Sequence, residues 1–173
     1  MRGRWMAGAA VVLVGFVAGC GSRTQPEQWG PASNGLRARV WLIGDEYKLG
    51  EPIRLRLAIR NESDKAQVVP RAIACFDIFD HLYFENKADS DDTRGGEGSA
   101  RSKEDLVVLE PGMTYEFPFD ARNLLVDPKR CEREGRYRYV LECQAWRAVG
   151  GEGNLSWSVS VSSNPVEFRV KSE

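Results

Sequence analysis

The chain has 173 residues, with 24 basic and 25 acidic side chains and a formal net charge of −1 at pH 7. This balance lacks the excess of Lys and Arg with which nucleic-acid-binding domains contact phosphates, so we expect no nucleic-acid partner. The single histidine limits catalytic and zinc sites, because most of them need a second histidine or a matched cysteine.

The first nineteen residues have the layout of a secretory signal peptide. Arg2 and Arg4 precede an apolar run at residues 6–16, which is too short to span a bilayer because a spanning helix takes about 20 residues. An aliphatic residue and two small residues then precede Cys20. We therefore predict that residues 1–19 are a signal peptide that is removed after export.

Residues 17–20 resemble the bacterial lipobox, whose cysteine receives diacylglycerol before the signal is cut away. The resemblance implies that Cys20 is the acylated first residue of the mature protein; the alternative is an ordinary signal peptide with a chance cysteine. Several acyl chains on one cysteine anchor a protein stably. Gly21 stands where an Asp commonly retains lipoproteins of Gram-negative bacteria at the inner membrane. In such a cell the resemblance implies the outer membrane, with the domain facing the periplasm.

A polar linker separates this segment from the rest of the chain. Residues 20–35 contain prolines, glycines and serines without hydrophobic periodicity, and we predict a flexible tether there. Loss of Arg2 and Arg4 leaves 22 basic residues against 25 acidic ones, a mature net charge near −3. Residues 36–173 have the length of one domain.

Period-two alternation of apolar and polar side chains dominates that domain. The clearest case is residues 53–60, with apolar residues at odd positions and arginines at 54, 56 and 60, which a half-buried strand explains. The same pattern, or a shorter apolar run, predicts strands at residues 36–42, 72–84, 106–109, 113–119, 137–143, 157–161 and 166–170. The 113–119 strand would point Met113 inward, and one or two helical turns are expected at 121–126, before Pro128.

Seven or eight antiparallel strands must pair their buried faces, and two packed sheets do so. The predicted fold class is an all-β antiparallel sandwich, with an open barrel as the alternative because alternation alone does not separate the two.

Turn and strand motifs at residues 50–52, 109–112, 135–139 and 163–168 resemble immunoglobulin-like modules of bacterial surface lipoproteins. This resemblance implies an immunoglobulin-like sandwich and makes Tyr137 the residue of a tyrosine corner. Residues 75–80 are similar to the small β-sandwich family named for an intracellular proteinase inhibitor of bacilli. The exported location argues against transferring that intracellular role.

Enzyme motifs are missing from the sequence. It contains no Gly-x-Ser-x-Gly elbow, His-Glu-x-x-His helix, phosphate-binding Gly-x-x-x-x-Gly-Lys loop or Cys-x-x-Cys pair, so we expect neither catalysis nor a cofactor. His81 lies near Asp77 and Asp80, but these two carboxylates differ in parity on a regular strand and would not share a face. A metal site is therefore not expected.

The segment 85–105 is polar, charged and rich in Gly and Ser. Its residues 89–94 invite comparison with a calcium loop, but Arg94 stands at the position of the required glycine and Ala100 at that of the bidentate Glu. We expect a long mobile loop, and loops of this kind often carry binding functions.

Three cysteines remain after Cys20. Cys131 precedes the 137–143 strand, which would place it too far along the chain from Cys143 for a disulfide. Cys75 is then the common partner, and an oxidising compartment favours a Cys75–Cys143 disulfide. The alternative is that all three thiols are reduced.

The sequence thus predicts a lipid-anchored cell-envelope protein that acts as a non-catalytic binding or scaffolding module for an envelope protein or glycan. Trp41 lies opposite in parity to Val40 and Leu42 and is the best candidate for an exposed ring, whereas Trp157 shares the parity of core residues. The competing function is a proteinase-inhibitor-like regulator that presents the 85–105 loop, and an envelope enzyme or metal-binding protein is a further alternative.

Overall fold

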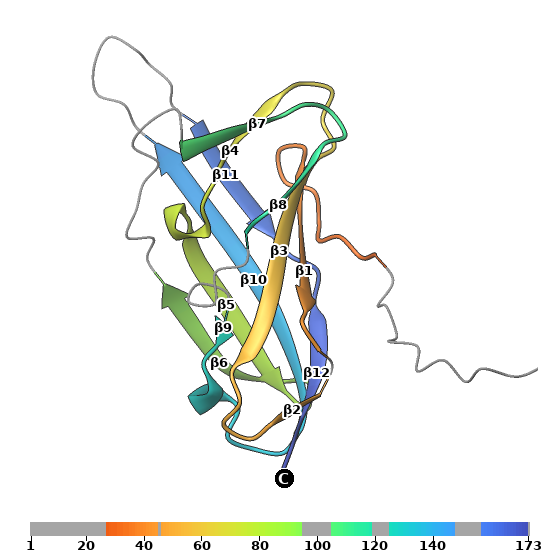
Figure 1. The fold of residues 1–173 in the computed structure, drawn as a ribbon, viewed down its shortest axis with the longest axis vertical. Helices are drawn as coiled ribbons and strands as arrows, with labels where there is room; N and C mark the ends of the chain where they lie inside the picture. Colours follow the sequence, from red (N-terminus) through yellow and green to blue (C-terminus); the bar gives the residue numbers. More distant parts are fainter. Residues whose placement is uncertain (1–26, 45, 95–104, 119–124, 148–156, 173) are drawn as a thin grey trace, which may run out of the picture.

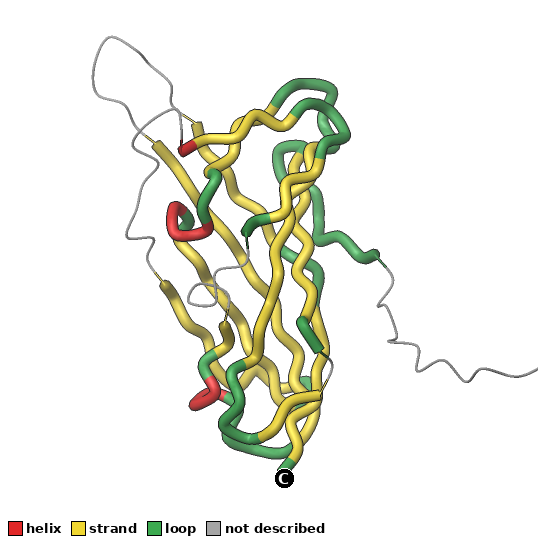
Figure 2. The backbone as a smooth tube through the Cα atoms, viewed as in Figure 1, coloured by secondary structure: helices red, strands yellow, loops and turns green. Residues whose placement is uncertain are grey.

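The structure, a computed structural model, describes residues 27–44, 46–94, 105–118, 125–147 and 157–172. Strands dominate this part of the chain, and 3-10 helices are its only helical elements (Figure 2). No described segment forms a helix long and apolar enough to cross a membrane. The strands are β1 (Leu36–Leu42), β2 (Glu46–Lys48), β3 (Ile53–Asn61), β4 (Gln67–Pro70), β5 (Asp77–Phe84), β6 (Lys87–Arg94), β7 (Leu106–Leu109), β8 (Thr114–Glu116), β9 (Leu125–Val126), β10 (Gly135–Arg147), β11 (Trp157–Ser162) and β12 (Val166–Lys171).

The predicted all-β sandwich is confirmed. One sheet has the order β1-β3-β8, with β9 also on β3, and the other has the order β2-β12-β10-β5-β6, with β11 also on β10. In Figure 1 the first sheet lies over the second, and β4 and β7 form a separate ribbon beside them. Nearly all pairings are antiparallel; β2 joins β12 in parallel. Two largely antiparallel sheets of this kind form a β-sandwich. The structure has more strands than the predicted seven or eight. The additional ones include β2 and β9, which have only two or three residues and are too short to show alternation in the sequence.

Alternation along the strands produces the core between the two sheets. Ile53, Leu55, Leu57 and Ile59 of β3 are completely buried, whereas Arg54 and Arg56 face solvent. Tyr137, Tyr139 and Leu141 of β10 complete the core from the opposite sheet. Burying one such aliphatic side chain contributes about 1.5–3 kcal/mol, so the register of the central strands is strongly determined.

The predicted 85–105 loop is wrong over its first half, because Lys87–Arg94 forms β6. Glu85 and Asn86 both have positive φ, 46° and 66°, which is the backbone of a two-residue type I′ hairpin turn. This turn folds β6 back along β5 as an antiparallel edge strand. Charged residues on an edge strand discourage pairing with other chains, which accounts for its polar sequence. Residues 95–104 lie outside the described part.

The helix predicted at 121–126 is also wrong at residues 125 and 126, the part of this segment that the structure describes. Leu125–Val126 is strand β9, paired with Ile53 and Arg54. The helical turn comes later as η3 (Pro128–Arg130), where the Asp127 carboxylate accepts a hydrogen bond from the Lys129 amide at 2.9 Å. Residues 121–124 lie outside the description.

Met113 is exposed, contrary to the prediction that it points inward. Its amide donates to the Glu110 carbonyl at 3.0 Å, which closes a turn and delays the strand until Thr114. Its side chain is 48% exposed, whereas Phe117 reaches the core.

The tether predicted at 20–35 is shorter at its domain end. Gly30 is buried, and its amide donates to the Ala38 carbonyl at 2.8 Å. A Cβ on Gly30 would lie 2.0 Å from the Ser162 carbonyl oxygen, so only glycine fits between β1 and β11. Glu27 pairs with Arg39 at 3.2 Å. The chain is therefore already packed on the sandwich beside β1, well before Leu36, and residues 20–26 lie outside the description.

Candidate functional site

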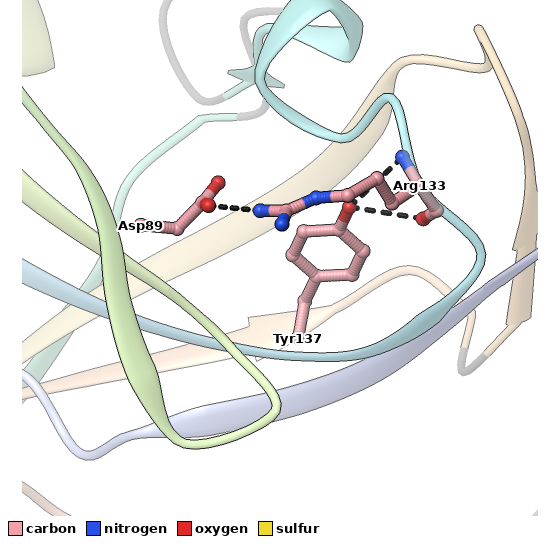
Figure 3. Close-up of polar contacts among 3 residues, drawn as sticks. All are labelled: Asp89, Arg133 and Tyr137. Atoms are coloured by element: carbon pink, nitrogen blue, oxygen red, sulfur yellow. Dashed lines mark hydrogen bonds and ion pairs between the residues drawn. The ribbon is translucent and has the colours of Figure 1, made fainter.

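Tyr137 forms the tyrosine corner that the sequence resemblance implies (Figure 3). Its hydroxyl donates to the Arg133 carbonyl at 2.9 Å and accepts from the Arg133 amide at 3.2 Å. The ring is 1% exposed and stacks on Phe168, with centroids 5.5 Å apart. Burial raises the pKa of the Tyr137 hydroxyl, although its hydrogen bond to Arg133 opposes the rise. The phenol is thus a neutral structural group.

The Arg133 side chain connects this corner to the edge of the sheet. Its guanidinium donates to the Asp89 carboxylate of β6, as Figure 3 shows, and lies 4.1 Å from the centroid of the Phe84 ring. Hollows at this end of the sandwich are lined mainly by charged groups, including Lys87, Asp89 and Arg133.

Asp80 is a second polar anchor, inside the core. Its side chain is completely buried on β5 and receives hydrogen bonds from the Arg130 guanidinium and, at 3.1 Å, from the Tyr139 hydroxyl. Arg130 belongs to η3 and is 13% exposed in its side chain. The ion pair therefore fixes the η3 connection to β5, and the carboxylate has no surface on which to meet a substrate.

His81 lies on the opposite side of β5 from Asp80, as the parity of the strand predicts. Its Nε2 is 3.9 Å from a carboxylate oxygen of Glu142 on β10. Asp77 shares the side of His81, so the two aspartates point to different sides of the sheet. In the ranges that the structure covers, no three His, Cys, Asp or Glu side chains gather as metal ligands.

A row of three rings runs along the solvent side of β5. Phe79, His81 and Tyr83 are each partly exposed, while the intervening Ile78, Asp80 and Leu82 are buried. We call Phe79, His81 and Tyr83 the aromatic row. It lies centrally in its sheet, with β10 on one side and β6 on the other.

Polar and apolar groups of β10 border the aromatic row. Val140 is the register partner of His81, Glu142 that of Phe79 and Arg138 that of Tyr83. The Arg138 guanidinium lies 5.5 Å from the centroid of the Tyr83 ring. Further along, the exposed Gln144 pairs with the exposed Ser160 of β11. The face thus combines ring surfaces with hydroxyl, amide and carboxylate groups.

The aromatic row was not predicted from the sequence, because residues 72–84 lack regular alternation and form an irregular apolar stretch. Apolar or aromatic side chains occupy both parities there, with Ile78 and Leu82 on one and Phe79 and Tyr83 on the other. In a strand with only one buried face, that pattern leaves rings on the solvent side. Trp41 is half-buried on the other sheet, with the Arg39 guanidinium 5.1 Å from its ring centroid. The side chains of Trp146 and Trp157, and all of Cys20, lie outside the description.

The three described cysteines are free, so the expected Cys75–Cys143 disulfide is not formed in this structure. Cys143 points into the core from β10, whereas Cys75 ends η1 (Ile73–Cys75) and is partly exposed. Burial raises the pKa of Cys143 and of Cys131 to about 12, and it also raises that of Cys75. Because the thiolate is the reactive form, the two buried thiols should be inert.

Of the three cysteines that the structure describes, we expect only Cys75 to react with a thiol reagent at pH 8 in the native protein. The unfolded chain, with thiol pKa values near 9.0, loses these protons before the folded one does. The free energy of unfolding should therefore fall as the pH rises from about 9 toward 12. Peptide mapping after labelling, and denaturation at pH 8.5 and 10.5, measure both effects. A Cys143→Ala variant should show a shallower fall. A labelling pattern with Cys75 and Cys143 both blocked until reduction would contradict the assignment.

Comparisons with known proteins assign no family. No family model matches the chain, and no curated protein matches it. Among solved structures, the chain is similar to a β-glucosidase from Listeria innocua, with 17% identity and a TM-score of 0.34. That match covers 78% of this chain and 16% of the enzyme. It is also similar to a β-glucosidase from Erythrobacter marinus, with 14% identity and a TM-score of 0.32. That match covers 73% of this chain and 15% of the enzyme. The chain thus spans about one sixth of the length of these enzymes, and similarity this low assigns it no activity.

Proposed function

We propose that this protein is a lipid-anchored binding module of the bacterial cell envelope that acts without catalysis and recognises a glycan with one face of its sandwich. The anchor is Cys20, from the resemblance of residues 17–20 to the lipobox. In a Gram-negative cell the domain would face the periplasm from the outer membrane. The binding face is the solvent side of β10, β5 and β6.

The aromatic row is the observation that carries this proposal. Phe79, His81 and Tyr83 retain solvent exposure on a central strand, where a charged or small residue would be equally compatible with the sheet. Ring faces supply apolar contact area, and neighbouring polar groups orient a ligand. Groups on the same face, among them Glu142, Gln144 and Ser160, can exchange hydrogen bonds with sugar hydroxyls.

The chemistry of the described residues supports binding rather than catalysis. The Asp80 carboxylate is enclosed and paired with Arg130, and the Tyr137 hydroxyl is held by backbone groups. His81 is the only histidine in the sequence, and a general base acts only when the proton that it removes is within hydrogen-bond reach. The His81 Nε2 lies 3.9 Å from a carboxylate oxygen of Glu142.

Replacing the rings of the aromatic row should weaken glycan binding without unfolding the protein. Ring contacts of this kind contribute about 0.5–1.5 kcal/mol each, so Phe79→Ala and Tyr83→Ala should each weaken binding about two- to twelvefold. The full mature protein in detergent, applied to an array of bacterial envelope glycans and then titrated with the strongest ligand, measures this.

Met113→Ala is the matched control, because it also removes an exposed apolar side chain but lies at the Glu110–Met113 turn. It should bind like the unaltered protein. Absence of binding to every glycan on the array, or equal binding by the Tyr83→Ala and control variants, would contradict the glycan proposal. Binding of a purified envelope protein that is lost in Tyr83→Ala would replace the glycan by a protein ligand on the same face.

The anchor is tested by Cys20→Ser. A serine carries no thioether, and the lipoprotein peptidase acts after the lipid is attached, so uncut precursor should accumulate without lipid. Labelling of cells with radioactive palmitate followed by electrophoresis measures both properties. Label in the Cys20→Ser protein, or membrane-bound mature protein of normal size, would show that the lipobox interpretation is wrong.

A further inference from the structure

The outer face of the β1-β3-β8 sheet is rich in arginine. Arg37 of β1 is the register partner of Arg60 of β3, and Trp41 is that of Arg56. Arg39 lies between Arg37 and Trp41 on the same side of β1, and Arg54 shares the side of Arg56 on β3. All these residues have the parity opposite to the core residues of their strands. We call this set the arginine face; it consists of Arg37, Arg39, Trp41, Arg54, Arg56 and Arg60.

Carboxylates neutralise only part of the arginine face. Glu62 pairs with Arg37 at 2.8 Å, Glu27 with Arg39 at 3.2 Å and Glu116 with Arg56 at 2.8 Å. Arg54 and Arg60 have no carboxylate partner among the residues that the structure describes. Five guanidinium groups against three carboxylates leave an excess positive charge on a face of a protein whose mature net charge is negative.

The chain reaches the sandwich next to this face. Glu27 contacts Arg39, and Gly30 is held between β1 and β11. Cys20 precedes Glu27 by seven residues, which even fully extended span at most about 25 Å. A lipid on Cys20 would therefore keep the β1 side of the domain close to the bilayer.

We propose that the arginine face docks on the phosphate-bearing head groups of an anionic lipid bilayer. This inference rests on the proposed anchor at Cys20. Guanidinium groups match phosphate oxygens with two parallel N–H donors, and basic side chains near an anionic membrane surface each strengthen its attraction. Trp41, at the edge of the face, has the amphipathic ring favoured at membrane–water interfaces. Docking in this orientation points the aromatic row, on the opposite sheet, away from the membrane.

Arginine modification of the full lipidated protein in vesicles tests the docking. Phenylglyoxal labelling is mapped by mass spectrometry in phosphatidylcholine vesicles and in vesicles that also contain phosphatidylglycerol. In the anionic vesicles Arg54 and Arg60 should label about tenfold more slowly, and 1 M salt should restore their rate because it shortens the screening length to about 3 Å. Arg136 and Arg169, exposed on the opposite sheet, are the internal control and should label equally in both.

Matched variants separate the charge of the face from simple proximity. In Arg54→Gln/Arg60→Gln the remaining Arg56 should lose its protection in anionic vesicles, whereas Arg136→Gln/Arg169→Gln should keep it. Equal labelling of both sheets in anionic vesicles, by a protein that floats with the vesicles, overturns the docking and leaves the anchor intact. Protection already present in phosphatidylcholine also overturns it. Failure to float with phosphatidylcholine vesicles would instead contradict the anchor.

Discussion

Replacing Tyr137 with alanine should lower the free energy of unfolding by about 3–5 kcal/mol, which is the usual cost of truncating a buried aromatic side chain. The ring is 1% exposed and contacts Phe168 and Phe84, with centroids 5.5 and 5.1 Å away. Its removal would open a cavity between the sheets and release Arg133 from the start of β10. Chemical denaturation measures the loss.

Two further variants divide this cost into its parts. Tyr137→Phe keeps the ring and removes only the bonds to the Arg133 backbone, so it should cost about 0.5–1.5 kcal/mol. Arg136→Ala changes an exposed neighbour on the same strand and should stay within about 0.5 kcal/mol. A larger loss in Arg136→Ala than in Tyr137→Ala would mean that the register of β10 is the reverse of the one described.

Arg130→Met should be comparably damaging, with a loss of about 3–5 kcal/mol, because it takes the guanidinium away from the buried Asp80 carboxylate. Asp80→Leu should cost less, since the Arg130 side chain retains 13% exposure and its charge can reach water. Urea denaturation of the two single variants measures this order.

The double variant Asp80→Leu/Arg130→Met removes both charges and should be more stable than Arg130→Met alone. Replacing a complete buried ion pair with apolar side chains is often neutral, whereas breaking it is not. The double-mutant cycle then gives a coupling energy of 0.5 kcal/mol or more in magnitude, within the range of about 0.5–3 kcal/mol for residues in contact. Costs that simply add would mean that Asp80 and Arg130 are not coupled as described.

The central strands could be predicted from the sequence because each has one buried face. Alternation along residues 53–60 determines which side chains enter the core, and the Gly135-x-Tyr137 motif locates the tyrosine corner. Local pattern was sufficient for these features.

Features that depend on distant partners or on unusual turns escaped prediction. Strand β6 has no apolar alternation, and its turn uses Glu85 and Asn86 in place of the common Asn-Gly pair. The burial of Asp80 could not be predicted from the local sequence because Arg130, whose guanidinium pairs with its carboxylate, lies 50 positions away in the chain. The partial exposure of the aromatic row likewise depends on which neighbours of β10 and β6 lie beside it.

The two outer faces of the sandwich differ in chemistry, and this difference unites the proposals. The arginine face lies beside the segment that leads to Cys20, and the aromatic row lies on the other sheet. A domain held by its lipid and oriented by its arginines would present the ring surfaces to the periplasmic space or, in another kind of cell, to the exterior.

The intact mass of the protein extracted from membranes tests the central claim, the anchored state, most directly. The mature chain should begin at Cys20 and be heavier than its amino acids by the mass of a diacylglyceryl group and, in a Gram-negative cell, an additional N-acyl chain. Fragmentation should place the added mass on Cys20. A mature chain that begins at any other residue, or one that begins at Cys20 with no added mass, would contradict it.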